Sequence, residues 1–410
     1  MPDAGRGSNG DGLGGSPTAG SSPRVAADHE PAQDNGAFAL LLGCFFVSGL
    51  AALIYQTAWT REFAFVFGTS ELAIATVLAA YMGGLAAGAA LAARVAPRIR
   101  RPILAYGVLE LSIALAALAV PLGILLAQKL YQVSFSASGQ PPGEGGLTTA
   151  LFYLVCSFAI LFVPTGLMGA TLPLLARHAV RSDAELGSRI GLLYATNTAG
   201  AVVGTVLAGF LLLPTIGLRN TVWVAVMGNA LVFGIATLLA RKVPARELSS
   251  APVAAGLSDR RSWILPLMLA SGVASFSYEV LWTRLLGHVL GASVYAFATM
   301  LATFLAGIAI GSWIASRRAT SAARSARAFS LAQLGTAAFS LLAFQMLDEL
   351  PDLSLRLAEL GLTARFADAA LAALVLLPAA MCIGSTYPFA VRILARGEAD
   401  AGPASARVYS

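Results

Sequence analysis

The sequence predicts an all-α polytopic membrane protein made of a duplicated six-helix unit. The second unit is truncated, and about ten transmembrane helices are expected in all. The first observation is composition: 57% of the residues are hydrophobic and 12% are charged, with a mean hydropathy of +0.74. A soluble domain carries about 25% charged residues, so these charges are too few to cover a soluble globule. The second observation is a series of long apolar runs, and the third is an internal repeat.

The repeat relates residues 48–88 to residues 271–311 at a constant offset of 223, and 18 of the 41 positions are identical. Gly88 and Gly311 are one such pair. Further along, the offset falls to 215, where Tyr194 meets Tyr409. Self-similarity at a fixed offset indicates a duplicated structural unit.

Ten apolar runs are each long enough to cross a bilayer, which takes about 20 residues in a helix. Helices are expected because an open strand would leave its backbone unsatisfied in lipid. The runs lie near 37–57, 72–96, 103–127, 149–176, 190–213, 221–240, 263–282, 293–315, 328–347 and 366–391.

The loops alternate in charge. The odd-numbered loops are poor in basic residues, and the ninth is net acidic. By the positive-inside rule, the even loops and the N-terminus are expected in the cytoplasm, with the chain in the cell's inner (plasma) membrane. The basic residues of the even loops are Arg94, Arg98, Arg100, Arg101, Arg177, Arg181, Arg189, Arg241, Lys242, Arg246, Arg260, Arg261, Arg317, Arg318, Arg324 and Arg327.

Residues 1–36 are rich in Gly, Ser, Pro, Ala and Asp and hold no apolar run. They predict a disordered cytoplasmic tail rather than a signal peptide. The rest divides into a first six-helix unit (37–242), a cytoplasmic linker (243–262) and an incomplete second unit of about four helices (263–410). Because the second unit stops near the match of Tyr194, we expect the chain to be the front part of a longer protein. A natural ten-span protein is the alternative.

Six plus six spans in parallel repeats, with the N-terminus inside, is the plan of the major facilitator transporters. A narrower resemblance is to the membrane part of the fused MFS/spermidine synthase proteins, in which a similar bundle precedes an aminopropyltransferase-like domain. That resemblance implies a polyamine as the solute. The domain itself is absent from the 410 residues, so it implies no enzyme activity here. The residues that carry it are YQTAWTRE (55–62), YEVLWTRLL (278–286), PTGLMGATLPLLAR (164–177) and LYATNTAGAVVGTVLAGFLLLPTIGLR (193–219).

Three polar side chains within the spans are candidates for substrate or coupling contacts. Glu110 lies deep in the third span, where a carboxylate is costly and faces the bundle or a cavity. It is expected either to bind a proton, a cation or a cationic substrate, or to make a structural interhelical hydrogen bond. Gln333, at the repeat-equivalent position, cannot carry a proton. Asn197 is a candidate substrate contact, although the glycines after it favour close helix packing.

A second group of candidates is duplicated near the outer ends of the first and seventh spans. One interpretation is an aromatic belt with snorkelling arginines. The other is an outer gate, in which Arg and Glu pair when a cavity closes. The group consists of Tyr55, Trp59, Arg61, Glu62, Tyr278, Glu279, Trp282 and Arg284.

Other function classes find no support in the sequence. The basic residues lie in short loops between apolar runs, so the net charge of +6 does not indicate a nucleic-acid partner. We find no P-loop, dinucleotide fingerprint, HExxH or nucleophile elbow, and therefore no catalytic residue, cofactor or metal site. Cys44, Cys156 and Cys382 lie in apolar runs and are expected to be free.

The sequence thus predicts a transporter-like membrane module, in contact with the lipid bilayer, that handles a small polar or cationic solute. The alternative is a membrane anchor or scaffold for an aminopropyltransferase-like domain, which transports nothing. A third interpretation is a protein that handles lipid-like substrates. The sequence leaves the oligomeric state open.

Overall fold

The structure is a computed structural model that describes residues 32–68, 71–135, 146–180, 185–242, 261–291, 293–359, 363–395 and 400–410. Residues 1–31 of the predicted tail and residues 243–260 of the predicted linker lie outside the described residues. So do Arg181, Arg246 and Arg260 of the basic loops.

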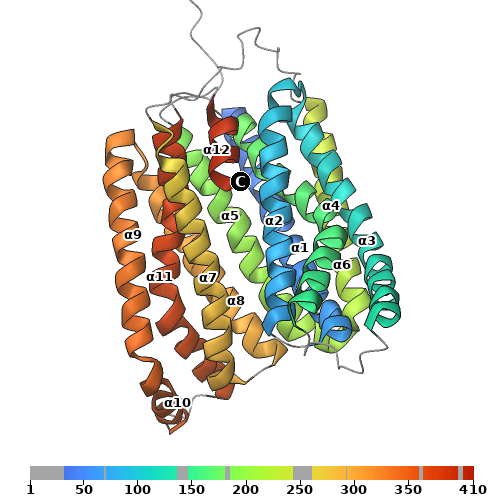
Figure 1. Cartoon of the computed structure of the whole chain (residues 1–410). Coiled ribbons are helices and arrows are strands. Elements are labelled where there is room, and N and C mark those ends of the chain that lie inside the picture. The colour runs from blue at the N-terminus through green and yellow to red at the C-terminus, as the bar shows by residue number, and fades with distance from the viewer. Residues whose placement is uncertain are drawn as a thin grey trace, which may run out of the picture.

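The described residues form helices and no strands, which confirms the all-α polytopic fold. In Figure 1 the helices stand side by side, with α1–α4 and α6 on one side and α7–α11 on the other. The first unit consists of α1 (Ala32–Phe67), α2 (Glu71–Val95), a 3₁₀ turn η1 (Ala96–Arg98), α3 (Pro102–Phe135), α4 (Leu147–Ala179), α5 (Leu186–Val206), a π-helical segment η4 (Leu207–Leu212) and α6 (Leu213–Lys242). The second consists of α7 (Ile264–Leu290), α8 (Val294–Arg318), α9 (Ala322–Gln345), a 3₁₀ turn η6 (Leu347–Glu349), α10 (Leu350–Glu359), α11 (Ala364–Leu394) and α12 (Ala401–Tyr409).

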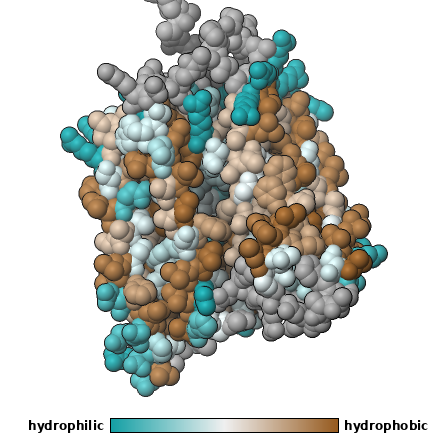
Figure 2. Space-filling model, in the orientation of Figure 1, coloured by the Kyte–Doolittle hydropathy of each residue, from teal (hydrophilic) through white to brown (hydrophobic). Residues whose placement is uncertain are grey.

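Nine helical stretches within the described ranges are long and apolar enough to cross a membrane. One of them, Leu186–Lys242, has 57 residues, far more than the ~20 that a single crossing needs. It is broken at Gly217, whose φ of 74° and ψ of 175° are not helical. This helix therefore supplies both the fifth and the sixth predicted spans. Figure 2 shows apolar side chains over the middle of the molecule and hydrophilic ones toward its two ends, as a bilayer requires.

Gly217→Ala is expected to destabilise the protein by about 2 kcal/mol. The backbone region that Gly217 occupies is nearly restricted to glycine, although a Cβ there would meet no other atom within 4 Å. Gly234→Ala, also on α6 and also without a neighbour within 4 Å, is the control. It should be neutral or stabilising, because alanine is the better helix former. Thermal unfolding in detergent measures both, and equal midpoints for the two variants would contradict the expected strain.

The helices differ from the predicted spans mainly in length. α1 begins five residues earlier and ends ten residues later than the run 37–57. Arg61 and Arg284 therefore do not end their helices, and each lies six residues before the last helical residue. α10 was not predicted. Its Leu350 is buried against the core of the second unit. The apolar side of α10 therefore packs on that unit, although the helix also carries several charged residues.

The repeat is visible in the packing of equivalent helix pairs. α2 crosses α4 where Gly88 lies against the backbone of Gly166, and where Gly169 lies against the backbone of Leu85. In the second unit α8 crosses α11 in the same way, with Gly311 on Met381 and Gly384 on Ile308. Each contact in one unit has its counterpart at the sequence offsets of the repeat. These glycines therefore serve close helix packing.

α12 is the counterpart of the beginning of α5. It starts at Ala401, 215 residues after Leu186, and its last residue, Tyr409, is equivalent to Tyr194. α5 packs on α8, and α12 packs on α2, which is the equivalent of α8. In Figure 1 α12 lies at one end of the bundle, between the two units.

Candidate functional site

A cavity of about 1110 Å³ lies between the two units. Residues of α1–α6 line it on one side and residues of α7 and α8 on the other, and α12 lies at one end. Figure 2 shows a recess between the units in the middle of the molecule. A largely apolar cavity with a few convergent polar groups is the usual form of a small-molecule site.

Glu110 does not line this cavity but lies directly behind its wall. Its side chain is 0% exposed. Ser48 Oγ donates to Glu110 Oε1 at 2.6 Å, and Asn229 Nδ2 donates to Glu110 Oε2 at 2.5 Å. Ser48 and Asn229 both line the cavity. The carboxylate thus joins α1, α3 and α6 through two charge-assisted hydrogen bonds.

The network extends to one of the duplicated aromatic residues. Tyr55 OH donates to Asn229 Oδ1 at 2.9 Å, and the Tyr55 ring stacks on Trp59 with centroids 5.0 Å apart. Tyr278 and Trp282 form the equivalent pair at 5.8 Å, with their rings edge to face. All four side chains are buried. These rings pack inside the two units, and whether they belong to an aromatic belt or to a gate stays a prediction.

The remaining substrate candidates are placed differently. Asn197 lines the cavity and donates to the carbonyl oxygen of Phe45 at 3.0 Å. Gln333 lies on α9, away from the cavity lining. The repeat therefore does not bring Glu110 and Gln333 into one site. Whether either residue contacts a solute stays a prediction.

The charged candidates of the proposed gate differ in exposure and surroundings. Glu279 lines the cavity from α7. Glu62 is partly buried in α1, and its Oε2 has no hydrogen-bond partner among the described residues. Arg61 is partly exposed near the end of α1. An Arg–Glu pair that closes the cavity stays a prediction.

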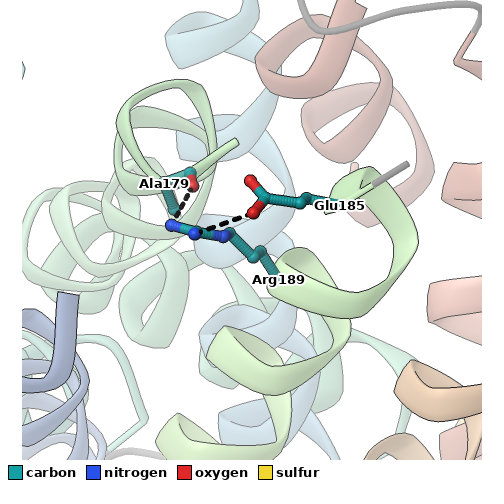
Figure 3. A network of polar contacts seen from close by, with 3 residues as sticks. All are labelled: Ala179, Glu185 and Arg189. Atoms are coloured by element: carbon teal, nitrogen blue, oxygen red, sulfur yellow. Dashed lines mark hydrogen bonds and ion pairs between the residues drawn. The ribbon is translucent and has the colours of Figure 1, made fainter. Parts of the chain in front are cut away.

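One ion pair is well defined at the end of the bundle where α5 begins. Figure 3 shows Arg189 between Glu185 and Ala179: its Nη2 donates to Glu185 Oε1 at 2.9 Å, and its Nη1 donates to the Ala179 carbonyl oxygen at 3.1 Å. Ala179 is the last residue of α4. The pair fastens the start of α5 to the end of α4 and does not face the cavity.

An aromatic cluster lies at the α12 end of the cavity. Tyr194 lies 4.5 Å from Tyr387 between ring centroids, and Tyr387 lies 6.0 Å from Tyr409. The hydroxyls of Tyr387 and Ser405 are 2.6 Å apart. Tyr194 and Tyr409, which the repeat makes equivalent, thus meet where the two units approach each other. Within the described ranges no three His, Cys, Asp or Glu side chains gather as a metal site would need.

Two features of the site were missed in the sequence. Asn229 is the partner that joins Glu110 to Tyr55, and its position in the middle of the apolar run 221–240 was the available signal. Gln56 lines the cavity and is equivalent to Glu279 in the repeat. The alignment of the two units, which pairs these two positions, was the available signal.

No family model matches the chain. It is similar to a polyamine aminopropyltransferase of Mycobacterium tuberculosis (strain CDC 1551 / Oshkosh), at 29% identity over 231 residues, covering 52% of this chain and 38% of the relative. It is similar also to polyamine aminopropyltransferase 1 of Streptomyces coelicolor, at 26% identity over 247 residues, covering 58% of this chain and 40% of the relative. The alignments thus span about two fifths of the length of these curated relatives. The chain is therefore a helical membrane protein with weak homology to polyamine aminopropyltransferases.

Proposed function

We propose that the chain is a transporter-like membrane module that takes a small polar or cationic solute into the cavity between its two units. The observation that carries this proposal is the cavity itself. It lies between repeat-related units, as solute sites do in transporters built from repeats, and a carboxylate, Glu279, lines it. Solute movement would come from rocking of one unit against the other, in the manner of the major facilitators.

The name of the relatives supports a polyamine or a related amine as the solute. The chain's basic loops support a cytoplasmic N-terminus in the inner membrane. The Arg-rich ends of α2 (Arg94), α6 (Arg241, Lys242) and α8 (Arg317, Arg318) then share the cytoplasmic side with the start of α1.

Flux of labelled 1,4-diaminobutane and spermidine into proteoliposomes tests the proposal. Ala52→Trp fills the cavity from α1 and is expected to lower flux at least tenfold. Leu115→Trp, on the exposed side of α3, is the control and should transport as wild type. Flux that is unchanged in Ala52→Trp would overturn the proposed route.

A second candidate function is an anchor or scaffold for an aminopropyltransferase-like domain. The observation that favours it is that the matched curated relatives carry this enzyme's name while the match covers about two fifths of their length. In that case wild-type proteoliposomes should show no flux above empty liposomes for either amine.

A further inference from the structure

One side of the cavity forms a groove between α2 and α7, the α2–α7 groove. Ala79, Met82 and Ala86 of α2 line one wall, and Leu269 and Val273 of α7 line the other. In Figure 1 α2 and α7 flank the space next to α12, and Figure 2 shows the recess there. Leu269 is 70% exposed and Val273 is 61% exposed. The described part of the chain therefore leaves most of this wall uncovered.

In the first unit the corresponding part of α1 is covered by α5. Gly200 of α5 lies against the backbone of Phe46, and Gly204 lies against the backbone of Leu50. At the offset of 223 residues, Phe46 and Leu50 correspond to the two α7 residues of the groove. The exposed positions of α7 are therefore the positions on which a helix is seated in the first unit.

A pair of equivalent glycines shows the same difference between the units. A Cβ at Gly49 of α1 would overlap the backbone of Asn197 on α5, whereas a Cβ at Gly272 of α7 would meet no atom within 4 Å. Of the most apolar stretch of each helix, 39% is buried in α1 and 6% in α7. α7 therefore has the sequence positions of a covered helix without the cover that α1 has.

The α2 wall differs from its equivalent, α8, in the same way. Gly209, in the segment η4 that continues α5, lies against Ala298 of α8. Ala298 is 0% exposed, whereas its equivalent Ala75 on α2 is partly exposed. One turn further along, Ala302 of α8 is buried, whereas its equivalent Ala79 lines the groove and is partly exposed. α5 lies between α1 and α8, so both walls of the groove correspond to walls that hold a helix.

The composition of the α7 wall favours a helix over lipid chains as its cover. Residues 270–277 read ASGVASFS, and six of these eight residues are Ala, Ser or Gly. Interfaces between membrane helices are enriched in such small residues, because they let two backbones approach closely. α5 uses Gly200 and Gly204 in this way against α1. The groove thus offers a surface that is suited to another helix.

We propose that the α2–α7 groove is a docking site for one further apolar transmembrane helix, with small residues every four positions on the side that faces α7. The helix would lie between α7 and α2 as α5 lies between α1 and α8, with α12 at its end. Glu279 would still face the cavity, because its equivalent Gln56 lines the cavity although α5 covers α1. The proposal goes beyond the proposed function and does not rest on it.

Photocrosslinking of the whole chain in lipid nanodiscs tests the proposal. A benzophenone side chain replaces Leu269, where the equivalent Phe46 shows that an aromatic ring is compatible with a docked helix. The probe is a biotinylated peptide of residues 186–212, and its control carries Gly200→Leu and Gly204→Leu. The native peptide is expected to crosslink at least tenfold more than the control peptide. With the benzophenone in place of the exposed Leu115 on α3, both peptides should give the same low yield.

The unmodified chain gives a second measurement, in case the benzophenone variant does not fold. A partner that binds the native state stabilises it, so the native peptide should raise the thermal unfolding midpoint and the control peptide should not.

Two crosslinking outcomes would overturn the proposal. Equal yields from the two peptides at position 269 would show only that they share the bilayer, so that lipid chains cover the groove. Crosslinks between two copies of the chain, with no peptide captured, would assign the groove to a second copy. Either outcome leaves the flux test with Ala52→Trp, and therefore the proposed function, unaffected.

Discussion

Replacing Gly88 by alanine is expected to destabilise the protein by about 3 kcal/mol, because a methyl group there would overlap the backbone of Gly166 on α4. Overpacking a filled interface costs about 1–3 kcal/mol, and sometimes more, when side chains must shift. Here the obstacle is main chain, which cannot rotate away. The upper end of that range is therefore expected, measured as a loss of unfolding free energy in mixed detergent micelles.

The control for Gly88→Ala is Gly43→Ala on the exposed side of α1, where a Cβ would meet nothing within 4 Å. It should change stability by less than about 1 kcal/mol and in the stabilising direction. Gly311→Ala, the repeat equivalent, should behave like Gly88→Ala because it faces the backbone of Met381. Equal stabilities of Gly88→Ala and Gly43→Ala would show that the close approach of α2 and α4 is not required.

Much of this fold could be predicted because membrane helices and duplications leave strong patterns. Apolar runs of about 20 residues place helices directly, and the repeat predicted that the two units are built alike. Helix extent was harder, since nothing in the sequence says that α1 continues ten residues beyond the apolar run 37–57. The helix continues there because residues such as Phe63 and Phe67 are buried against the rest of the first unit.

The site could be predicted only in part. A carboxylate in the third span was conspicuous, but its partner Asn229 lies 119 residues further along the chain, and no local pattern joins the two. The repeat drew attention to positions that are identical in both units, such as Tyr55 and Tyr278. Those side chains pack inside each unit. The cavity is lined instead at a position where the units differ, Gln56 and Glu279.

Glu110→Ala is expected to cost about 3 kcal/mol or more in unfolding free energy. It removes the acceptor of two buried donors, the Ser48 hydroxyl and the Asn229 amide, and an unsatisfied buried donor costs about 1–3 kcal/mol. It also leaves a cavity in a packed interior. Glu110→Gln keeps the volume and should cost less, about 1–2 kcal/mol. Its amide oxygen can still accept one of the two hydrogen bonds, and only where its amide nitrogen faces Asn229 Nδ2 do two donors meet.

A swap of the two polar side chains separates hydrogen bonding from charge. In Glu110→Gln with Asn229→Asp, the amide donates to the carboxylate, and Tyr55 can still donate to position 229 as it does to Asn229. The double variant should therefore be more stable than Glu110→Gln alone. Asn229→Asp alone sets two carboxylates against each other and should be the least stable of the three. Additive effects of the two single substitutions would contradict the direct contact.

Glu110→Gln also tests whether the network couples to the solute. Ser48 and Asn229 each touch both the cavity and the Glu110 carboxylate, so a change of charge at Glu110 can reach the cavity through either residue. We expect Glu110→Gln to lower amine flux in proteoliposomes at least tenfold while the protein remains folded. Flux equal to wild type would leave Glu110 as a structural link between α1, α3 and α6. The charge that matters for solute would then be that of Glu279, which lines the cavity itself.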